Sequence, residues 1–148
     1  MAKLVLPKLV SHKVSQGKHS LRFWSTACAR GEEPYSIAIM LAEFLRDKLG
    51  DFDIQIYATD INRQVLKEAK AGVYSLKDAE SLPRDILKSY FVRNSNGYMV
   101  RPSIRRMVSF SYFDLTSTTK QPFADLDCIF CCNLLIYLHK QLLEKAWG

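Results

Sequence analysis

The sequence predicts an α/β domain built on a mainly parallel sheet, and three observations lead to this prediction. Short β-rich runs alternate with segments of helical periodicity, as where "LRFWS" at 21–25 precedes "IAIMLAEFLRDKLG". The 148 residues are 48% hydrophobic and 24% charged, which suits one compact domain with a core. Strands separated by helices need right-handed crossovers, which build parallel sheets with a ligand crevice beyond the carboxyl ends of the strands.

The first half of the chain gives a β-α-β-α order. After the strand at 21–25, we expect a helix that ends at Gly50, a residue that commonly stops helices. A second strand, "DIQIYATD" at 53–60, is followed by a helix, "NRQVLKEAKAG", that Gly72 closes. These elements form one half of the predicted sheet.

Residues 73–106 interrupt this order and predict a small inserted β-subdomain. "LPRDILKSYF" is typical of a short helix, and "YFVRNSNGYMVRP" predicts a hairpin that turns at Asn96-Gly97. The core then resumes with a third strand, "MVSFSYFDL" at 107–115, and a fourth, "DLDCIFCC" at 125–132. "HKQLLEKAW" begins a further helix.

Charge is unevenly distributed over the chain, whose net charge is +6. Residues 1–20 hold four lysines and no acid, and we interpret them as a basic N-terminal tail. A second basic cluster lies at 93–106. Such patches favour an acidic partner or are simply solvated. Nucleic acid is not the expected partner, because aromatic residues are not interleaved with the basic ones. No apolar run of roughly 18 residues predicts membrane insertion, so a cytoplasmic protein is expected.

The cysteines do not predict a metal site. Cys128 and Cys131 form a C-x-x-C, but they lie in the apolar run "CIFCC", and no second ligand pair follows at the spacing of a zinc site. We expect no metal, and buried thiols in a reducing compartment.

The loop after the first strand indicates what the crevice binds. Small residues, among them Ala27 and Cys28, let a ligand approach the backbone. Glu32 and Glu33 then open the helix, where they would repel a pyrophosphate, so a dinucleotide is disfavoured. A cationic ligand without phosphate, such as S-adenosylmethionine, suits this loop. The alternative is that both glutamates only complement the helix dipole.

Polar residues also end the other predicted strands. Asp60 ends the second strand, where an acid can accept both ribose hydroxyls of an adenosine. Asp114 ends the third, where it suits an adenine amino group while Leu115 packs on the ring, and Asn133 ends the fourth near the reacting end of the ligand. The alternatives are that Asp60 caps a helix and Asp114 starts a turn.

Several segments together resemble one family. "LRFWSTACARGEEPYSIAIML", "IYATDINRQVLKEAKAGVYS", "KSYFVR", "VSFSYFDL" and "IFCCNLLIYL" are similar to the chemotaxis-receptor glutamate methyltransferases, the CheR family. The resemblance covers about residues 21–145. It implies a Rossmann-like methyltransferase domain over 21–148, with the inserted subdomain at about 73–106.

The resemblance also assigns site residues. It implies that Glu33 holds the methionine amino end or nearby ribose, Asp60 the ribose hydroxyls, Asp114 and Leu115 the adenine, and Asn133 the methionyl portion of S-adenosylmethionine. Tyr137 resembles the family's tyrosine that faces the substrate; the alternative is a core aromatic residue. Where the family usually has an arginine beside this cofactor, the present chain has Cys132.

The family reaction transfers a methyl group to glutamate carboxylates on a receptor's signalling helices. Chemoreceptors or other helical signalling proteins are therefore the expected partners. A receptor-tail peptide is expected to add to strand edges of the inserted subdomain, around Gly97 to Arg101. The alternative is an impaired cofactor-binding or interaction module of the same fold. A nicotinamide dehydrogenase would need a glycine-rich phosphate turn that the sequence lacks.

The two ends of the chain depart from the family pattern. The first 20 residues do not match the family's N-terminal helical domain, and the chain stops after the fourth core strand, so the C-terminal strands of the usual sheet are expected to be missing. The fourth strand would then be an open apolar edge, which favours a homodimer through that edge.

Overall fold

The main sheet is parallel and has four strands in the part of the chain that the structure describes. The structure is a computed structural model that describes residues 2–114 and 123–131. The strand order is β6-β2-β1-β7, and every neighbouring pair is parallel, as predicted. The strands are β1 (Ser20–Thr26), β2 (Asp53–Asp60), β6 (Val108–Tyr112) and β7 (Cys128–Cys131).

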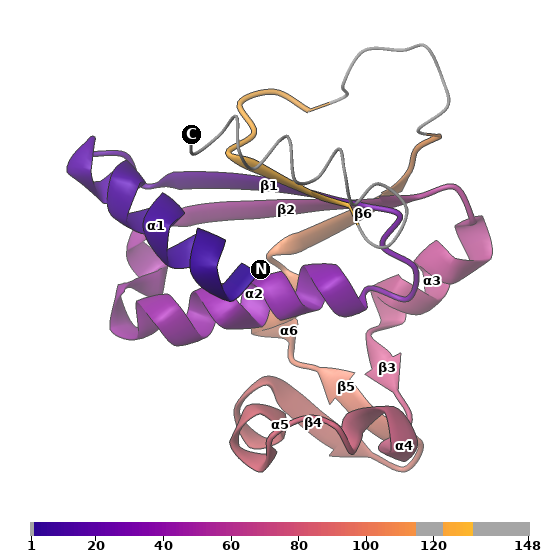
Figure 1. Ribbon diagram of the computed structural model, residues 1–148. Coiled ribbons are helices and arrows are strands. Elements are labelled where there is room, and N and C mark those ends of the chain that lie inside the picture. The colour runs from indigo at the N-terminus through magenta and orange to yellow at the C-terminus, as the bar shows by residue number, and fades with distance from the viewer. Residues whose placement is uncertain (1, 115–122, 132–148) are drawn as a thin grey trace.

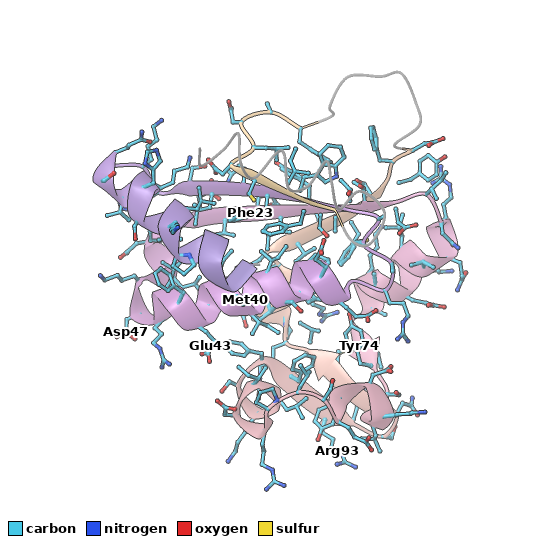
Figure 2. All side chains as sticks on the ribbon, in the orientation of Figure 1. Phe23, Met40, Glu43, Asp47, Tyr74 and Arg93 are labelled. Carbon is cyan, nitrogen blue, oxygen red and sulfur yellow. The ribbon has the colours of Figure 1, made fainter. Side chains whose placement is uncertain are left out.

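Helix α2 (Glu32–Leu45) covers one face of this sheet because its apolar residues recur at helical spacing. Ile37, Ala38 and Leu41 are fully or almost fully buried, and so is Phe23 on β1. Figure 2 places Phe23 between the sheet and this helix. Helix α3 (Arg63–Ala71) lies on the same side of the sheet in Figure 1.

The strand order reverses beside β1. From β1 the chain passes through α2 to β2, and β6 then extends the sheet farther in the same direction. Strand β7 instead pairs with the other side of β1, with Thr26 opposite Cys131. Such a reversal opens a crevice at the carboxyl ends of the strands, and ligands bind there in open α/β sheets.

A second, antiparallel sheet lies in the range 73–106, where the sequence predicts an insertion. Its strand order is β3-β5-β4, and in Figure 1 it lies below α2, away from the main sheet. The inserted range contains, in chain order, β3 (Val73–Tyr74), α4 (Leu76–Ala79), α5 (Arg84–Tyr90), β4 (Phe91–Asn94), β5 (Gly97–Val100) and α6 (Pro102–Arg105).

The hairpin of this sheet turns one residue earlier than expected. Ser95 and Asn96 form the turn, and Gly97 already pairs with Asn94. A Cβ atom on Gly97 would lie 2.1 Å from the carbonyl oxygen of Tyr74. The glycine therefore serves a close approach between strands rather than the turn itself.

Strand β5 is central, which corrects the docking edge expected at Gly97 to Arg101. It pairs with β3 on one side and with β4 on the other, so its backbone groups are engaged in the sheet. The outer side of β4 is an open edge within this sheet.

The basic tail expected at residues 1–20 is also corrected. Residues Ala2–Ser15 form helix α1, which packs beside α2 and buries Leu9 and Val10 in the core. Its Lys13 ammonium lies 2.7 Å from the Asp127 carboxylate. The apolar residues between the lysines, rather than the lysine charges, determine where this segment lies.

The helix after β1 is shorter than expected. Helix α2 ends at Leu45, and a 3₁₀ helix, η1 (Arg46–Asp51), continues the chain past Gly50. Helix α3 ends as predicted, with Gly72 in the left-handed conformation at its C-cap. No helix among the described residues is both long and apolar enough to cross a membrane.

Candidate functional site

The β1–α2 loop, residues 27–31, has an unusual backbone. Ala27, Ala29 and Gly31 have φ angles of 52°, 50° and 90°. Glycine adopts such angles readily, but each alanine in this region costs about 1–3 kcal/mol. The surrounding structure must therefore impose this shape on the loop.

Contacts to the end of β2 hold the loop in place. The Cys28 N–H donates to the Thr59 carbonyl at 3.0 Å, and the Ala29 N–H donates to the Asp60 carboxylate at 2.9 Å. At the other end of the loop, the Gly31 N–H donates to the Cys28 carbonyl at 2.9 Å. The loop and the strand end thus form one unit, in which Cys28 contacts Thr59 and Ala29 contacts Asp60.

Gly31 allows the loop to pack closely on its surroundings. A Cβ atom there would lie 3.1 to 3.3 Å from Tyr35, Ala69 and Phe110, which come from α2, α3 and β6. A larger residue would displace these neighbours, in addition to the strain from the positive φ angle.

The Asp60 carboxylate organises two turns at once. Its Oδ2 accepts from Ala29 on the first loop, and its Oδ1 accepts from the Asn62 N–H at 2.9 Å. The N-cap of α3 is Asn62, whose side chain accepts from the N–H groups of Gln64 and Val65, so Asp60 is not the cap. A carboxylate has about four acceptor positions, so Asp60 still has capacity for hydroxyl donors.

Glu33 lies one residue inside α2 and faces the sheet. Its Oε1 accepts a hydrogen bond from the hydroxyl of Ser25 at 2.8 Å, and Ser25 is completely buried at the end of β1. Burial raises the pKa of Glu33, and the Ser25 hydrogen bond opposes part of that rise. Within the described residues, Glu33 forms no salt bridge, whereas Glu32 lies 3.7 Å from Arg30.

The end of β6 adjoins Asp60. The Phe113 N–H donates to the Asp60 carbonyl at 3.2 Å, and the half-buried Asp114 follows. The Arg63 guanidinium lies over the Tyr112 ring at 4.3 Å on the same edge. The sheet therefore brings the acids at the ends of β2 and β6 to neighbouring positions.

Four predicted site residues lie outside the described part of the chain: Leu115, Cys132, Asn133 and Tyr137. Within the described part, no group of three or more His, Cys, Asp or Glu side chains could hold a metal ion. Cys128 is buried in β7, and burial raises the pKa of its thiol to about 12, so it stays protonated.

A comparison of the sequence with models of known families finds one that covers almost the whole chain. Residues 1–147 match the model of the CheR methyltransferase, SAM binding domain. The chain belongs to the CheR family. The match begins at residue 1 and so includes helix α1.

The relatives of this CheR-family chain are chemotaxis methyltransferases from several bacteria. The chain is 39% identical over 140 residues to chemotaxis protein methyltransferase 2 of Pseudomonas aeruginosa, which covers 88% of the chain and 49% of that relative. It is 34% identical over 139 residues to the chemotaxis protein methyltransferase of Borreliella burgdorferi, covering 93% of the chain and 49% of that relative. The chain thus spans about half the length of the curated relatives it matches.

A solved structure shows a weaker likeness to this CheR-family chain. The crystal structure of the methyltransferase domain of bacterial-CtHen1-CN aligns over 94% of this chain and 54% of that chain, with a TM-score of 0.41 and 19% identity.

The sequence did not predict the roles of two residues that adjoin Glu33 and Asp60. Ser25 anchors Glu33, and its signal was a small polar residue at the end of an apolar strand. Ile61 directly follows Asp60, and 58% of its surface is exposed although it is a large apolar residue. An isoleucine directly after a strand-ending acid gave no signal by itself, because exposed apolar residues are common on protein surfaces.

Proposed function

We propose that this CheR-family chain binds S-adenosylmethionine at the carboxyl edge of its main sheet and transfers the methyl group to glutamate carboxylates of a chemoreceptor-type signalling protein. The observation that carries the proposal is the Glu33 carboxylate, which is half-buried, anchored by Ser25 and without a salt bridge in the described chain. The alternative, a module without turnover, is not favoured by the family match.

The residues present fit this cofactor. S-adenosylmethionine has an ammonium group and ribose hydroxyls but no phosphate, and Glu33 and Asp60 offer carboxylates for a cation and for hydroxyl donors. The small side chains of Ala27 and Ala29 leave the loop backbone accessible, and Ile61 offers an exposed apolar surface beside Asp60. Asp114 follows β6 and is half-buried, and in this proposal it receives the adenine end.

The chemistry asks for positioning more than for proton transfer. When bound, S-adenosylmethionine supplies a methyl group on a sulfonium leaving group. A glutamate carboxylate is already ionised at neutral pH, so the chain needs no general base for the attacking oxygen. The role of the loop, Glu33 and Asp60 is to hold the donor in one orientation, which provides much of the rate enhancement in reactions of this kind.

A receptor-tail peptide would dock on the inserted subdomain at the outer edge of β4. This edge has unpaired backbone groups within its sheet, and Val92 on it is 38% exposed. An extended peptide can add to such an edge through main-chain hydrogen bonds. Arg93 on the same strand gives the edge a positive charge, which suits a peptide with an acidic residue.

The test is calorimetric titration of the chain with S-adenosylmethionine and with its demethylated product. Asp60→Ala removes the carboxylate at the carboxyl end of β2, and Asp53→Ala, at the opposite end of the same strand, is the matched control. We expect binding by the wild type and by Asp53→Ala, and loss of at least tenfold in affinity for Asp60→Ala. A folded wild-type chain that binds neither compound would overturn the proposal.

A further inference from the structure

The inserted subdomain contacts the β1–α2 loop through a tyrosine. Tyr74, on β3, donates its hydroxyl hydrogen bond to the Arg30 carbonyl at 2.8 Å. Arg30 lies between Ala29 and Gly31, both of which have positive φ angles. Figure 2 labels Tyr74 at the top of the inserted subdomain, on the side that faces α2. The contact therefore joins the second sheet to the strained loop of the candidate cofactor site.

A charged contact runs in parallel with this hydrogen bond. The Arg30 guanidinium lies 3.5 Å from the Asp78 carboxylate on α4, another element of the inserted subdomain. Both side chains are substantially exposed, so this ion pair adds little by itself. It shows, however, that the subdomain contacts both the backbone and the side chain of Arg30.

The position of Tyr74 is itself fixed by its surroundings. Its backbone pairs with Tyr98 on β5, and Gly97 approaches it so closely that a Cβ atom on Gly97 would lie 2.1 Å from the Tyr74 carbonyl oxygen. Its ring meets the rings of Tyr35 and Phe91 edge to face, at centroid distances of 6.4 and 6.5 Å. Burial raises the pKa of Tyr74 above its usual value, so the hydroxyl stays protonated and remains a donor.

We propose that Tyr74 is a positioning residue, through which the inserted subdomain holds the β1–α2 loop in the conformation that binds S-adenosylmethionine. This inference rests on the function proposed above. It gives the subdomain a second role, because a contact on its inner side then contributes to cofactor affinity independently of any partner on its outer edge.

The physical reason is the strain in the loop. Ala27 and Ala29 are held at φ angles that alanine avoids, so the loop relaxes toward other conformations when its contacts are removed. If only a fraction of the molecules has the binding conformation, the apparent dissociation constant increases by the inverse of that fraction. Loss of the Tyr74 hydrogen bond should lower this fraction without removing any atom that touches the ligand.

The experiment compares Tyr74→Phe with Tyr98→Phe by calorimetric titration with S-adenosylmethionine, together with thermal unfolding of each variant. Tyr74→Phe keeps the ring contacts and removes only the hydroxyl. Tyr98 lies on the neighbouring strand, and its hydroxyl makes no hydrogen bond within the described residues, so Tyr98→Phe is the matched control. We expect about three- to tenfold weaker binding for Tyr74→Phe and no change for Tyr98→Phe.

Hydrogen exchange distinguishes a positioning role from a merely structural one. The inference predicts faster exchange of the Ala29 and Gly31 amides in Tyr74→Phe, while the amides of β5 stay protected. A wild type that binds and a Tyr74→Phe variant that binds equally well, whatever its melting temperature, would overturn the inference and leave the proposed function intact. A folded wild type that does not bind would overturn the proposed function, and this inference with it.

Discussion

At the scale of single residues, Glu33 gives the site a pH dependence. Burial raises its pKa in the folded chain from the usual 4.5, although the Ser25 hydrogen bond opposes the rise. A cationic ligand needs the ionised carboxylate, so affinity for S-adenosylmethionine should fall as the pH is lowered through the raised pKa, which lies above 4.5. Ser25→Ala removes the opposing hydrogen bond and should move this fall to higher pH. Titration calorimetry between pH 4.5 and 8 measures both; superimposable profiles would contradict the prediction.

The same carboxyl group should oppose stability at neutral pH. Because the folded state holds the Glu33 proton more tightly than the unfolded state, its contribution to stability is lost as the pH rises from 4.5 through the raised pKa. Glu33→Gln keeps an acceptor for Ser25 but cannot ionise. In urea denaturation, we expect the unfolding free energy of Glu33→Gln, relative to that of the wild type, to increase as the pH rises from 4.5 to 7. Its affinity for S-adenosylmethionine should fall roughly tenfold or more. A variant that loses stability at pH 7 would contradict this.

The residue scale also shows what the sequence could and could not predict. The sequence predicts Asp60 and Glu33 as candidate site residues because acids at strand ends and helix starts are visible in a sequence. The hydrogen-bond partners of these two acids could not be predicted, because Ser25 contacts Glu33 and Ala29 contacts Asp60 only after the strands have paired. The path of the turn also determines that Asn62, and not Asp60, is the N-cap of α3.

At the scale of elements, Gly97 makes a prediction about the inserted sheet. Any Cβ atom there meets the Tyr74 carbonyl at 2.1 Å, and the φ angle of 146° also disfavours other residues. Gly97→Ala should therefore separate β3 from β5 and destabilise the chain by about 1–3 kcal/mol. Gly50→Ala is the control, because no atom lies within 4 Å of its Cβ position. Chemical denaturation measures both, and equal stability of the two variants would contradict the prediction.

Elements with a strong period were predicted best. Strand β2 has the predicted bounds, Asp53–Asp60, and α3 ends at the predicted glycine. The prediction failed for α1, whose sequence has lysines between its apolar residues and no capping signal, so only its packing against α2 shows that it belongs to the core. The central position of β5 also could not be predicted, because β3 has only two residues and gives no strand pattern.

At the scale of the whole molecule, Asp127 joins three elements at the amino ends of the strands, opposite the candidate site. Its carboxylate accepts from the Arg22 N–H of β1 at 2.8 Å and lies 2.7 Å from the Lys13 ammonium of α1, directly before β7 begins. Only 15% and 12% of the Lys13 and Asp127 side chains are exposed, so water replaces these contacts poorly if the carboxylate is removed.

Asp127→Ala should consequently destabilise the whole chain by about 1–3 kcal/mol, because it leaves a partly buried N–H and a poorly hydrated ammonium without their acceptor. Asp127→Asn keeps an acceptor for Arg22 and should lose less. Asp53→Asn is the surface control: its carboxylate lies 2.6 Å from Arg22, but 74% of its side chain is exposed, so the change should stay within about 0.5 kcal/mol. Urea denaturation ranks the three variants. Because the site lies at the other end of the strands, S-adenosylmethionine affinity of the folded Asp127 variants should remain that of the wild type, and a parallel loss of affinity would show that the two ends of the sheet are coupled.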